Sequence, residues 1–423
     1  MFSHSGFSDT DANGITMKNL LSAFDPDAKA QFYCDVQPPD FSAASDHFRV
    51  TDIQMIKACL GKRSRHVFSS QEEKTQQCAP ADHTKSNARK IPAGLKKYKY
   101  NFCLKWLREW LWQVSPWGHR QLDQWIAEVD PDAIVYMVGE SLFMDKLVLK
   151  TCKETGKPLI LYNGEAFRII DLSTRHGLER AYYKRTQTLY RRLNQQAELV
   201  IYNCRMLQED YQAFYPPKAK TMIAYNSADR VCADYQCREV NPVITYFGNL
   251  GVGRSDSLLQ VADVLQSISD SLVLDIYGNA TAENQTRFEA HPAVHYHGFV
   301  NATQLRQIIE GSDILLHVES FDEGIIPKLK YAFSTKIAQC MRSGRCFVSY
   351  APSGSASSQY LAALDGPVLI SDGEQLPILL RQLIENPLLR QEKAHKTLLV
   401  GEQNHNMQKT AKLVRLQIEK TAH

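Results

Sequence analysis

Residues 331–345, with the sequence YAFSTKIAQCMRSGR, are the most informative stretch of this chain. Ser334 is a favourable helix N-cap, and Gly344 stands where a helix commonly ends. Between them, apolar residues recur at helical spacing: Ile337, Cys340 and Met341. The stretch therefore predicts a short helix that begins at Ser334.

Lys336 falls in the first turn of this predicted helix, where the helix dipole disfavours a cation unless an anion lies close by. The hydroxyls of Ser334 and Thr335, the free backbone N–H groups and the lysine together favour a phosphate site. An exposed lysine on an ordinary helix explains the residue equally well in isolation. The neighbouring segments favour the phosphate site.

A second phosphate-compatible turn follows the predicted buried strand 243–247. Its sequence, GNLGVGR over Gly248 to Arg254, leads into an apolar helical run. Glycines let the backbone approach a pyrophosphate closely, and the Arg254 guanidinium matches phosphate oxygens. The glycine order is not G-x-G-x-x-G and no Walker lysine follows, so neither NAD nor a P-loop is supported. A third small-residue loop, 351–358, follows the predicted strand 346–350.

Strand-like and helical segments alternate along the whole chain, which indicates an α/β fold. Buried parallel strands are expected at 133–138, 158–162 and 198–202, and again near Ile244, Leu272, Ile314, Phe347 and Val368. The pattern predicts two doubly wound, Rossmann-like domains facing a cleft, over residues 1–240 and 241–400. Residues 1–7 make a poor first strand. Helical periodicity over 403–418 predicts a C-terminal helix within residues 401–423.

The composition is that of an ordinary globular enzyme. The chain has 423 residues, 44% hydrophobic and 22% charged, and a net charge of +3, which does not call for nucleic acid. Its ten cysteines form no C-x-x-C pair, which fits a reducing compartment. No signal peptide and no long apolar run is visible. We therefore expect a cytoplasmic protein.

From Ile244 to about Leu361 the sequence resembles the nucleotide-sugar-binding half of GT-B glycosyltransferases of family 4, which build bacterial surface polysaccharides. Short motifs carry the resemblance: YFGNLG at 246–251, DIYG at 275–278, HGF at 297–299, SDILL at 312–316, STKI at 334–337 and SGR at 343–345. The segment DANGIT at 11–16 also resembles the first glycine loop of that family, with Gly14 close to the donor. The resemblance implies the GT-B fold, in which the C-terminal helix crosses back to the first domain.

Two departures from the family pattern concern charged residues. An arginine and a lysine usually grip the diphosphate after the first glycine turn, and Asn249 and Arg254 take those positions here. The family's Glu-x7-Glu motif falls on Tyr331 and Gln339, so both carboxylates are absent. Gln339 can still bind a ribose hydroxyl. The acidic residues of the preceding loop, Glu319 first among them, are candidates to replace the first carboxylate, or else form a solvated loop.

The resemblance implies a glycosyltransferase that moves a sugar from a nucleotide diphosphate-sugar to a glycan or lipid-linked glycan, probably with retention. The expected donor-binding residues are Gly14, Gly248, Asn249, Gly251, Arg254, Ser334, Thr335, Lys336 and Gln339. The expected catalytic residues are Glu165, Glu319, Arg254 and Lys336. No metal or further cofactor is expected, because no Asp-x-Asp motif suggests a required metal. A nucleotide-sugar 2-epimerase of the same fold and a non-catalytic sugar-nucleotide-binding or scaffold protein are the alternatives.

Glu165 follows a predicted strand in the sequence NGE at 163–165, and GES at 139–141 ends the strand before it. A carboxylate at a strand end has the geometry to position an acceptor hydroxyl or to act as its base. In retaining enzymes of the resembled fold, the leaving phosphate is thought to take the acceptor proton. The protein would then stabilise the departing diphosphate.

All the tryptophans of the chain lie within about twenty residues, directly after a basic segment. They are Trp106, Trp110, Trp112, Trp117 and Trp125, and the cations before them are Arg89, Lys90, Lys96, Lys97 and Lys99. Such a mixture is typical of an interfacial helix on an anionic membrane, here over Arg89 to Trp117. The alternative is a helix that buries its aromatic residues against the sheet. We expect peripheral attachment at the inner face of the cytoplasmic membrane.

Overall fold

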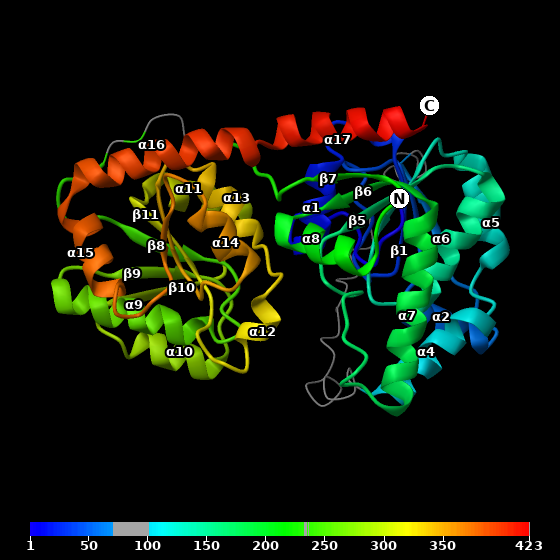
Figure 1. The fold of residues 1–423 in the computed structure, drawn as a ribbon, viewed down its shortest axis with the longest axis horizontal. Coiled ribbons are helices and arrows are strands. Elements are labelled where there is room, and N and C mark those ends of the chain that lie inside the picture. Colours follow the sequence, from blue (N-terminus) through cyan, green and yellow to red (C-terminus); the bar gives the residue numbers. More distant parts are fainter. Residues whose placement is uncertain (71–100, 232–234, 236, 423) are drawn as a thin grey trace, which may run out of the picture. The chain divides into compact units, whose positions relative to one another are not determined.

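The computed structural model describes residues 1–70, 101–231, 235 and 237–422. Two compact units are present (Figure 1): unit 1 comprises Met1–Ala224 and Ala411–His423, and unit 2 comprises Tyr225–Thr410. Unit 2 begins at Tyr225, before residue 241 where the sequence places the second domain, and Ala411–His423 belongs to unit 1.

Unit 1 is built on a mostly parallel sheet in two parts. One part has the order β1-β2-β3 and the other β4-β5-β6-β7. Only β3 runs antiparallel to its neighbour. The strands are β1 (Ala30–Tyr33), β2 (Asp46–Arg49), β3 (Val67–Ser69), β4 (Ile134–Met137), β5 (Leu159–Asn163), β6 (Ala197–Tyr202) and β7 (Lys220–Ile223).

Phe2 joins the two parts of this sheet. It forms parallel bridges to Phe32 of β1 and to Tyr136 of β4. The sequence indicated a poor first strand here, and the structure agrees in that only one residue pairs. Its ring is buried against Phe32, with ring centroids 5.4 Å apart. One buried residue therefore takes the place of a full strand.

Helices cover both faces of the unit 1 sheet. They are α1 (Ala12–Leu20), α2 (Asp52–Cys59), α4 (Phe102–Val114), α5 (His119–Val129), α6 (Leu142–Thr155), α7 (Gly177–Gln196), α8 (Arg205–Phe214) and the last turns of α17 (Met407–Ala422). Apolar residues of α1 and α17 share one core with β4, β5 and β6. The segment 11–16, expected as a glycine loop, instead forms the start of α1 with Asp11 as its N-cap.

Unit 2 has a six-stranded parallel sheet with the order β10-β9-β8-β11-β12-β13. In chain order this is 3-2-1-4-5-6, the order of a Rossmann fold. The strands are β8 (Ile244–Phe247), β9 (Leu274–Tyr277), β10 (Val294–Gly298), β11 (Ile314–Val318), β12 (Cys346–Tyr350) and β13 (Val368–Ile370). The strand order changes direction between the parallel neighbours β8 and β11, and ligands of such sheets bind at the carboxyl ends of the strands beside this point.

Separate apolar cores on the two faces of this sheet make unit 2 a doubly wound domain. Its helices are α9 (Arg254–Ile268), α10 (Ala282–Glu289), α11 (Ala302–Gly311), α12 (Ile326–Leu329), α13 (Thr335–Met341), α14 (Ala356–Ala362), α15 (Leu376–Glu385) and α16 (Pro387–Asn404). Helices α9 and α15 pack on one face, and α11, α13 and α14 on the other. The predicted α/β class with two Rossmann-like domains is confirmed.

The expected helix over 403–418 is interrupted. Helix α16 ends at Asn404 and α17 begins at Met407. His405 between them is buried, with its Nδ1 2.6 Å from the Asn226 carbonyl oxygen, and the Asn406 side chain accepts a hydrogen bond from the Lys409 N–H. These contacts replace helical hydrogen bonds, and apolar periodicity alone does not reveal them.

Candidate functional site

The candidate site of unit 2 lies at the carboxyl ends of β8 and β11. The turn after β8 contains Gly248 and leads to Arg254 at the start of α9, and Glu319 directly follows β11. Lys336, from α13, reaches the same turn. Strand order and sequence thus bring together three of the predicted catalytic residues.

Position 248 requires a glycine because the Lys336 side chain packs against its backbone. Its φ of +117° favours glycine, and a Cβ there would lie 2.8 Å from Cδ and 3.2 Å from Nζ of Lys336. The neighbouring Gly278 is equally constrained, since a Cβ would lie 2.0 Å from the Gly248 carbonyl oxygen. The glycines therefore allow a lysine side chain and two strand ends to pack closely.

The Lys336 side chain is buried, and it contacts an aromatic ring rather than a carboxylate. Its Nζ donates to the Tyr246 hydroxyl at 2.7 Å and lies 4.2 Å from the ring centroid. Burial, and the nearby Arg254 charge, lower the pKa of Lys336 to about 7. At neutral pH the Lys336 amine is therefore only partly protonated. An anion beside it would favour the charged form and raise the pKa of Lys336 again.

Arg254 and Glu319 form an ion pair next to this lysine. The Arg254 Nη2 lies 2.8 Å from Oε2 and 2.9 Å from Oε1 of Glu319, and both side chains are largely buried. His317 lies 3.4 Å from the same carboxylate. Burial disfavours the charge of Glu319, but His317 and Arg254 outweigh it and lower the pKa of Glu319 to about 2. The carboxylate is thus a permanent partner of Arg254.

The remaining predicted donor-binding residues of unit 2 surround this group. Ser334 caps α13 as predicted, accepting from the Lys336 N–H at 3.3 Å. Thr335 and Gln339 of the same helix are half-buried. The Asn249 side chain accepts from the Gly251 N–H at 2.7 Å, so it stabilises the turn. Both of these residues are exposed.

Gly14 and Glu165 belong to unit 1. Gly14 is buried in α1, where a Cβ would lie 2.6 Å from the Gly6 carbonyl oxygen and 2.7 Å from the Ser8 Cβ. Packing of residues 6–8 on the helix therefore accounts for this glycine.

Glu165 follows β5 as predicted, and its carbonyl oxygen accepts from the Tyr211 hydroxyl at 2.9 Å. Glu165 as a whole residue is exposed, but its carboxyl group is partly desolvated. This desolvation, together with the charge of Glu140 just after β4, raises the pKa of Glu165. Glu140 itself pairs with Lys105 at 3.4 Å. Two neighbouring strand ends of unit 1 thus present carboxylates to one region.

Most of the tryptophans are core residues. Trp112, Trp117 and Trp125 are buried, and Trp112 stacks on Phe143 with ring centroids 4.0 Å apart. Trp117 and Trp125 contact Phe32 of β1 and Phe48 of β2, so for these two the alternative of packing against the sheet is correct. Trp110 is 56% exposed. The basic residues Arg89, Lys90, Lys96, Lys97 and Lys99 lie outside the described residues.

A cavity of about 760 Å³ in unit 1 lies at the opposite edge of its sheet. Its lining includes Ala30, Asp46 and Ile134, which begin β1, β2 and β4. Ligands of α/β sheets bind at the carboxyl ends of the strands, so we do not place the candidate site there.

Tyr246 and His317 are site residues that the sequence-based reasoning missed. Both lie within predicted strands, at 243–247 and near Ile314. A polar side chain inside a buried apolar run is the signal that could have identified them, because buried polar groups require partners.

No family model and no curated protein sequence matches this chain. Its structure, however, is similar to solved structures along nearly its full length. HepE of Anabaena in complex with UDP has a TM-score of 0.63 and 12% identity, with 99% of this chain and 98% of that chain covered. Sucrose-phosphate synthase from Thermosynechococcus elongatus has a TM-score of 0.59 and 10% identity, covering 99% and 97%.

WaaG, a glycosyltransferase involved in lipopolysaccharide biosynthesis, has a TM-score of 0.55 and 11% identity, with 98% of each chain covered. At such low identities these similarities establish the fold alone. The chain therefore has the fold of GT-B glycosyltransferases, with two Rossmann-like domains.

Proposed function

We propose that this protein is a retaining glycosyltransferase of the family 4 type, which transfers a sugar from a nucleotide diphosphate-sugar to a glycan or lipid-linked glycan in surface-polysaccharide biosynthesis. The observation that carries the proposal is the placement of Lys336 and Arg254 at the ends of β8 and β11, where the strand order of the unit 2 sheet changes direction. Structures of similar fold support it: HepE is solved with UDP and with UDP-glucose, and WaaG acts in lipopolysaccharide biosynthesis.

In this proposal unit 2 binds the donor. Lys336 and Arg254 neutralise the diphosphate, and the hydroxyls of Ser334 and Thr335 bind its oxygens. The amide of Gln339 binds a ribose hydroxyl. Asn249 and Gly251 hold the turn in the shape that admits the phosphates.

Glu319 positions Arg254 for this role. Without the carboxylate, the guanidinium would be a largely buried charge with no counter-charge and would keep only its long hydrogen bond to the Gly251 carbonyl oxygen, at 3.4 Å. Because Glu319 already neutralises Arg254, the excess positive charge available to the diphosphate comes from Lys336. Together, Lys336, Arg254 and Glu319 carry a net charge of +1 when the lysine is protonated.

In the transfer step, an acceptor hydroxyl oxygen bonds to the anomeric carbon of the donor as the bond to the diphosphate breaks. The acceptor proton passes to the leaving phosphate, and the two cations stabilise the new negative charge. Glu165 positions the acceptor by accepting a hydrogen bond from one of its hydroxyls other than the attacking one. For that role the carboxyl must be ionised.

Changing Glu165 to Gln is therefore expected to lower turnover by about a hundredfold or more, with donor affinity close to that of the parent. The measurement is acceptor-dependent release of UDP from UDP-glucose, tested with a panel of mono- and disaccharide acceptors. A 2-epimerase would convert its nucleotide-sugar without any acceptor, and a binding protein would release no UDP.

Glu140→Gln is the matched control because the charge of Glu140 raises the pKa of Glu165. Removing the charge of Glu140 lowers the pKa of Glu165. The acidic limb of the pH–rate profile should therefore shift to lower pH, while the rate on the plateau stays near the parent value. An equal loss of donor affinity in Glu165→Gln would place this residue on the donor sugar instead. An unchanged rate would exclude it from the reaction.

We also propose peripheral attachment to the inner face of the cytoplasmic membrane, as part of a cytoplasmic location. None of the helices in the described part of the chain is long and apolar enough to span a bilayer. Two neighbouring helices carry exposed apolar side chains: Ile53, Ile56 and Leu60 of α2, and Leu104, Leu107, Trp110 and Val114 of α4. The Trp112 indole N–H links α4 to α2 by donating to Asp52 at 2.8 Å.

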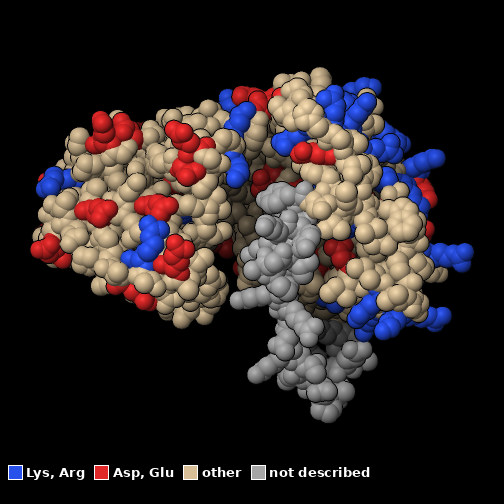
Figure 2. Space-filling view, turned by 90° about the horizontal axis from the view of Figure 1, so that it is seen from below, with Lys and Arg blue, Asp and Glu red and all other residues tan. Residues whose placement is uncertain are grey.

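Exposed cations accompany this apolar surface of α2 and α4, among them Lys57, Lys62 and Arg63. On the face of unit 1 seen in Figure 2, Lys and Arg side chains gather along the right-hand edge beside a largely uncharged area. Each cation near an anionic bilayer contributes on the order of 1 kcal/mol, and salt screens the attraction. Apolar side chains and cations together favour an anionic membrane over a neutral one.

The double substitution Leu107→Glu with Trp110→Glu is expected to abolish salt-sensitive binding to vesicles that contain phosphatidylglycerol, because it places carboxylates on this surface. Leu413→Glu, a change of another exposed leucine on α17, should leave binding intact. Sedimentation with vesicles at low and high salt measures both. If the parent does not bind these vesicles at low salt, the tryptophans between residues 106 and 125 serve only packing, and the acceptor is soluble.

A further inference from the structure

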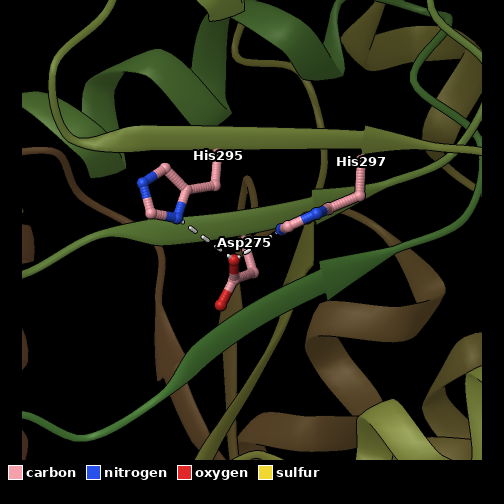
Figure 3. Close-up of side chains that lie close together, drawn as sticks. All are labelled: Asp275, His295 and His297. Atoms are coloured by element: carbon pink, nitrogen blue, oxygen red, sulfur yellow. Dashed lines mark hydrogen bonds and ion pairs between the residues drawn. The ribbon is translucent and has the colours of Figure 1, made fainter.

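Three potential metal ligands lie together on the edge of the unit 2 sheet, apart from the residues discussed so far (Figure 3). Asp275 belongs to β9, and His295 and His297 belong to the edge strand β10. Their ligand atoms all lie within 4.8 Å of one another. The His297 Nε2 is 2.7 Å and the His295 Nδ1 is 3.7 Å from Oδ1 of Asp275.

The pairing of β9 with β10 places these side chains on one face of the sheet. His295 lies directly opposite Asp275 in the register. His297 lies at a register shift in β10, where it has no partner residue on β9, and from there its Nε2 reaches the same carboxylate. The alternate residues Leu274, Ile276 and Val294 belong to the buried core on the other face. Backbone geometry therefore fixes three ligands from two strands on a surface open to water.

The ring of His297 is held in place by a neighbour. Tyr277, two residues after Asp275, stacks on it with ring centroids 4.5 Å apart and an interplanar angle of 9°. This contact restricts rotation of the imidazole while its Nε2 points at the carboxylate. Support of this kind around a ligand is typical of metal sites in proteins.

The distances are compatible with a bound cation, which would replace the hydrogen bond between the His297 Nε2 and Asp275. Zinc binds imidazole nitrogen and carboxylate oxygen at about 2.0–2.2 Å, which in tetrahedral geometry separates ligand atoms by roughly 3.3 Å. The distances of 2.7 and 3.7 Å bracket that value, so small side-chain rotations suffice. Two imidazoles and one carboxylate favour Zn²⁺ over Mg²⁺ or Ca²⁺, which prefer oxygen ligands.

We propose that Asp275, His295 and His297 bind one Zn²⁺ ion, with water in the remaining coordination position. The proposal departs from the sequence-based expectation of no metal, because the approach of Asp275 to His295 depends on the pairing of β9 with β10. The ion joins β9 to β10 just before Gly278 and Gly298, whose backbones hydrogen-bond to each other at 2.8 Å. Zinc binding therefore stabilises the strand end on which the Gly248 turn packs.

The test is titration of the full-length chain, freed of metal with EDTA, with Zn²⁺ by calorimetry, and with Co²⁺ by visible absorption. The parent is expected to bind one equivalent at this site and to melt at a higher temperature with Zn²⁺. Co²⁺ should give the strong d–d bands of a four-coordinate nitrogen and oxygen site. Mg²⁺ should cause neither effect.

His295→Gln and Asp275→Asn are expected to weaken Zn²⁺ binding at least about tenfold, because each removes one of three ligands. The matched control is His291→Gln. His291 is also paired with one aspartate, Asp263 at 3.1 Å, but among the described residues no third ligand completes that pair. This control should bind Zn²⁺ as the parent does.

All these variants retain the exposed thiols of Cys59 and Cys103, so binding at a thiol would persist equally in each. Unchanged Zn²⁺ affinity in both ligand variants would overturn the proposal. Equal weakening in His291→Gln would do the same, as would a parent that binds no equivalent of Zn²⁺.

Discussion

Replacing Lys336 by Met is expected to weaken binding of UDP roughly 10- to 150-fold at pH 6.5, and to slow transfer by a further 10²- to 10³-fold. Methionine preserves the apolar stem that packs on Gly248 and removes the ammonium. The expected loss in affinity is that of one charge-assisted hydrogen bond, about 1.5–3 kcal/mol. Calorimetry with UDP and with uridine separates the phosphate contribution, because uridine should bind both proteins alike.

The same lysine predicts how UDP affinity depends on pH. In the free protein its pKa is about 7, and a bound diphosphate raises it. Affinity should therefore fall as pH rises above 7, by up to about tenfold per unit, until the higher pKa of the complex is reached. At pH 8 binding should be accompanied by proton uptake, seen by calorimetry in buffers of different ionisation enthalpy.

Measurements between pH 7.5 and 9 avoid the titration of the phosphate itself, whose pKa is about 6. Lys336→Met should lose both the slope and the proton uptake, whereas Lys328→Met, an exposed lysine of α12, should keep them. A Lys336→Met protein that binds UDP with the parent's affinity and slope would refute the phosphate role of this residue.

Asp145→Asn is expected to reduce the free energy of unfolding of unit 1 by about 3–5 kcal/mol at pH 8. Asp145 of α6 is fully buried and lies 2.8 Å from the guanidinium of Arg168, which is itself fully buried. The Tyr136 hydroxyl donates to the same carboxylate oxygen at 2.8 Å. Removing the carboxylate leaves the guanidinium charged and uncompensated in the core.

The cost of Asp145→Asn should depend on pH. Burial, only partly offset by Arg168, raises the pKa of Asp145 to about 6, above its ordinary value of 3.8. The native state therefore binds this proton more tightly than the unfolded state, and its contribution to stability is lost as pH rises from 4 through 6. The parent thus loses stability between pH 5, where its carboxyl is neutral, and pH 8, where the pair is charged, whereas the asparagine variant has no proton to lose. The substitution should therefore cost less at pH 8 than at pH 5.

Urea unfolding of parent and variant at pH 5 and pH 8 measures this difference. Asp123→Asn provides the control, since its ion pair with Lys150 is exposed and should contribute no more than about 1 kcal/mol. If Asp145→Asn cost no more than Asp123→Asn at pH 8, the buried pair would not be a main source of stability.

Local pattern predicted most of the regular elements of unit 2. Residues 243–247 are uniformly apolar or β-branched and form β8, and Ser334 is the N-cap that its position indicated. Such elements follow from hydrophobic period and capping, which are properties of adjacent residues. The α/β class could therefore be predicted with no knowledge of tertiary contacts.

Contacts between distant residues could not be predicted in this way. The sequence identified Arg254 and Glu319 separately, but their ion pair depends on β8 and β11 being neighbours. The approach of Asp275 to His295 depends on the register of two strands. Gly14 was interpreted as a loop residue because a glycine near Asp11 fits a turn and a helix start equally well.

The return of the last helix to unit 1 has a consequence for the order in which this protein is made. Val414 and Ile418 pack in the same core as Phe7 and Met17, although nearly four hundred residues separate them. While the ribosome is still synthesising the chain, unit 2 can close its own core, because all of its residues are contiguous. Unit 1 is begun first, yet it can complete its core only after residue 418 has emerged, so the usual order in which the N-terminal domain folds first is reversed at the final step.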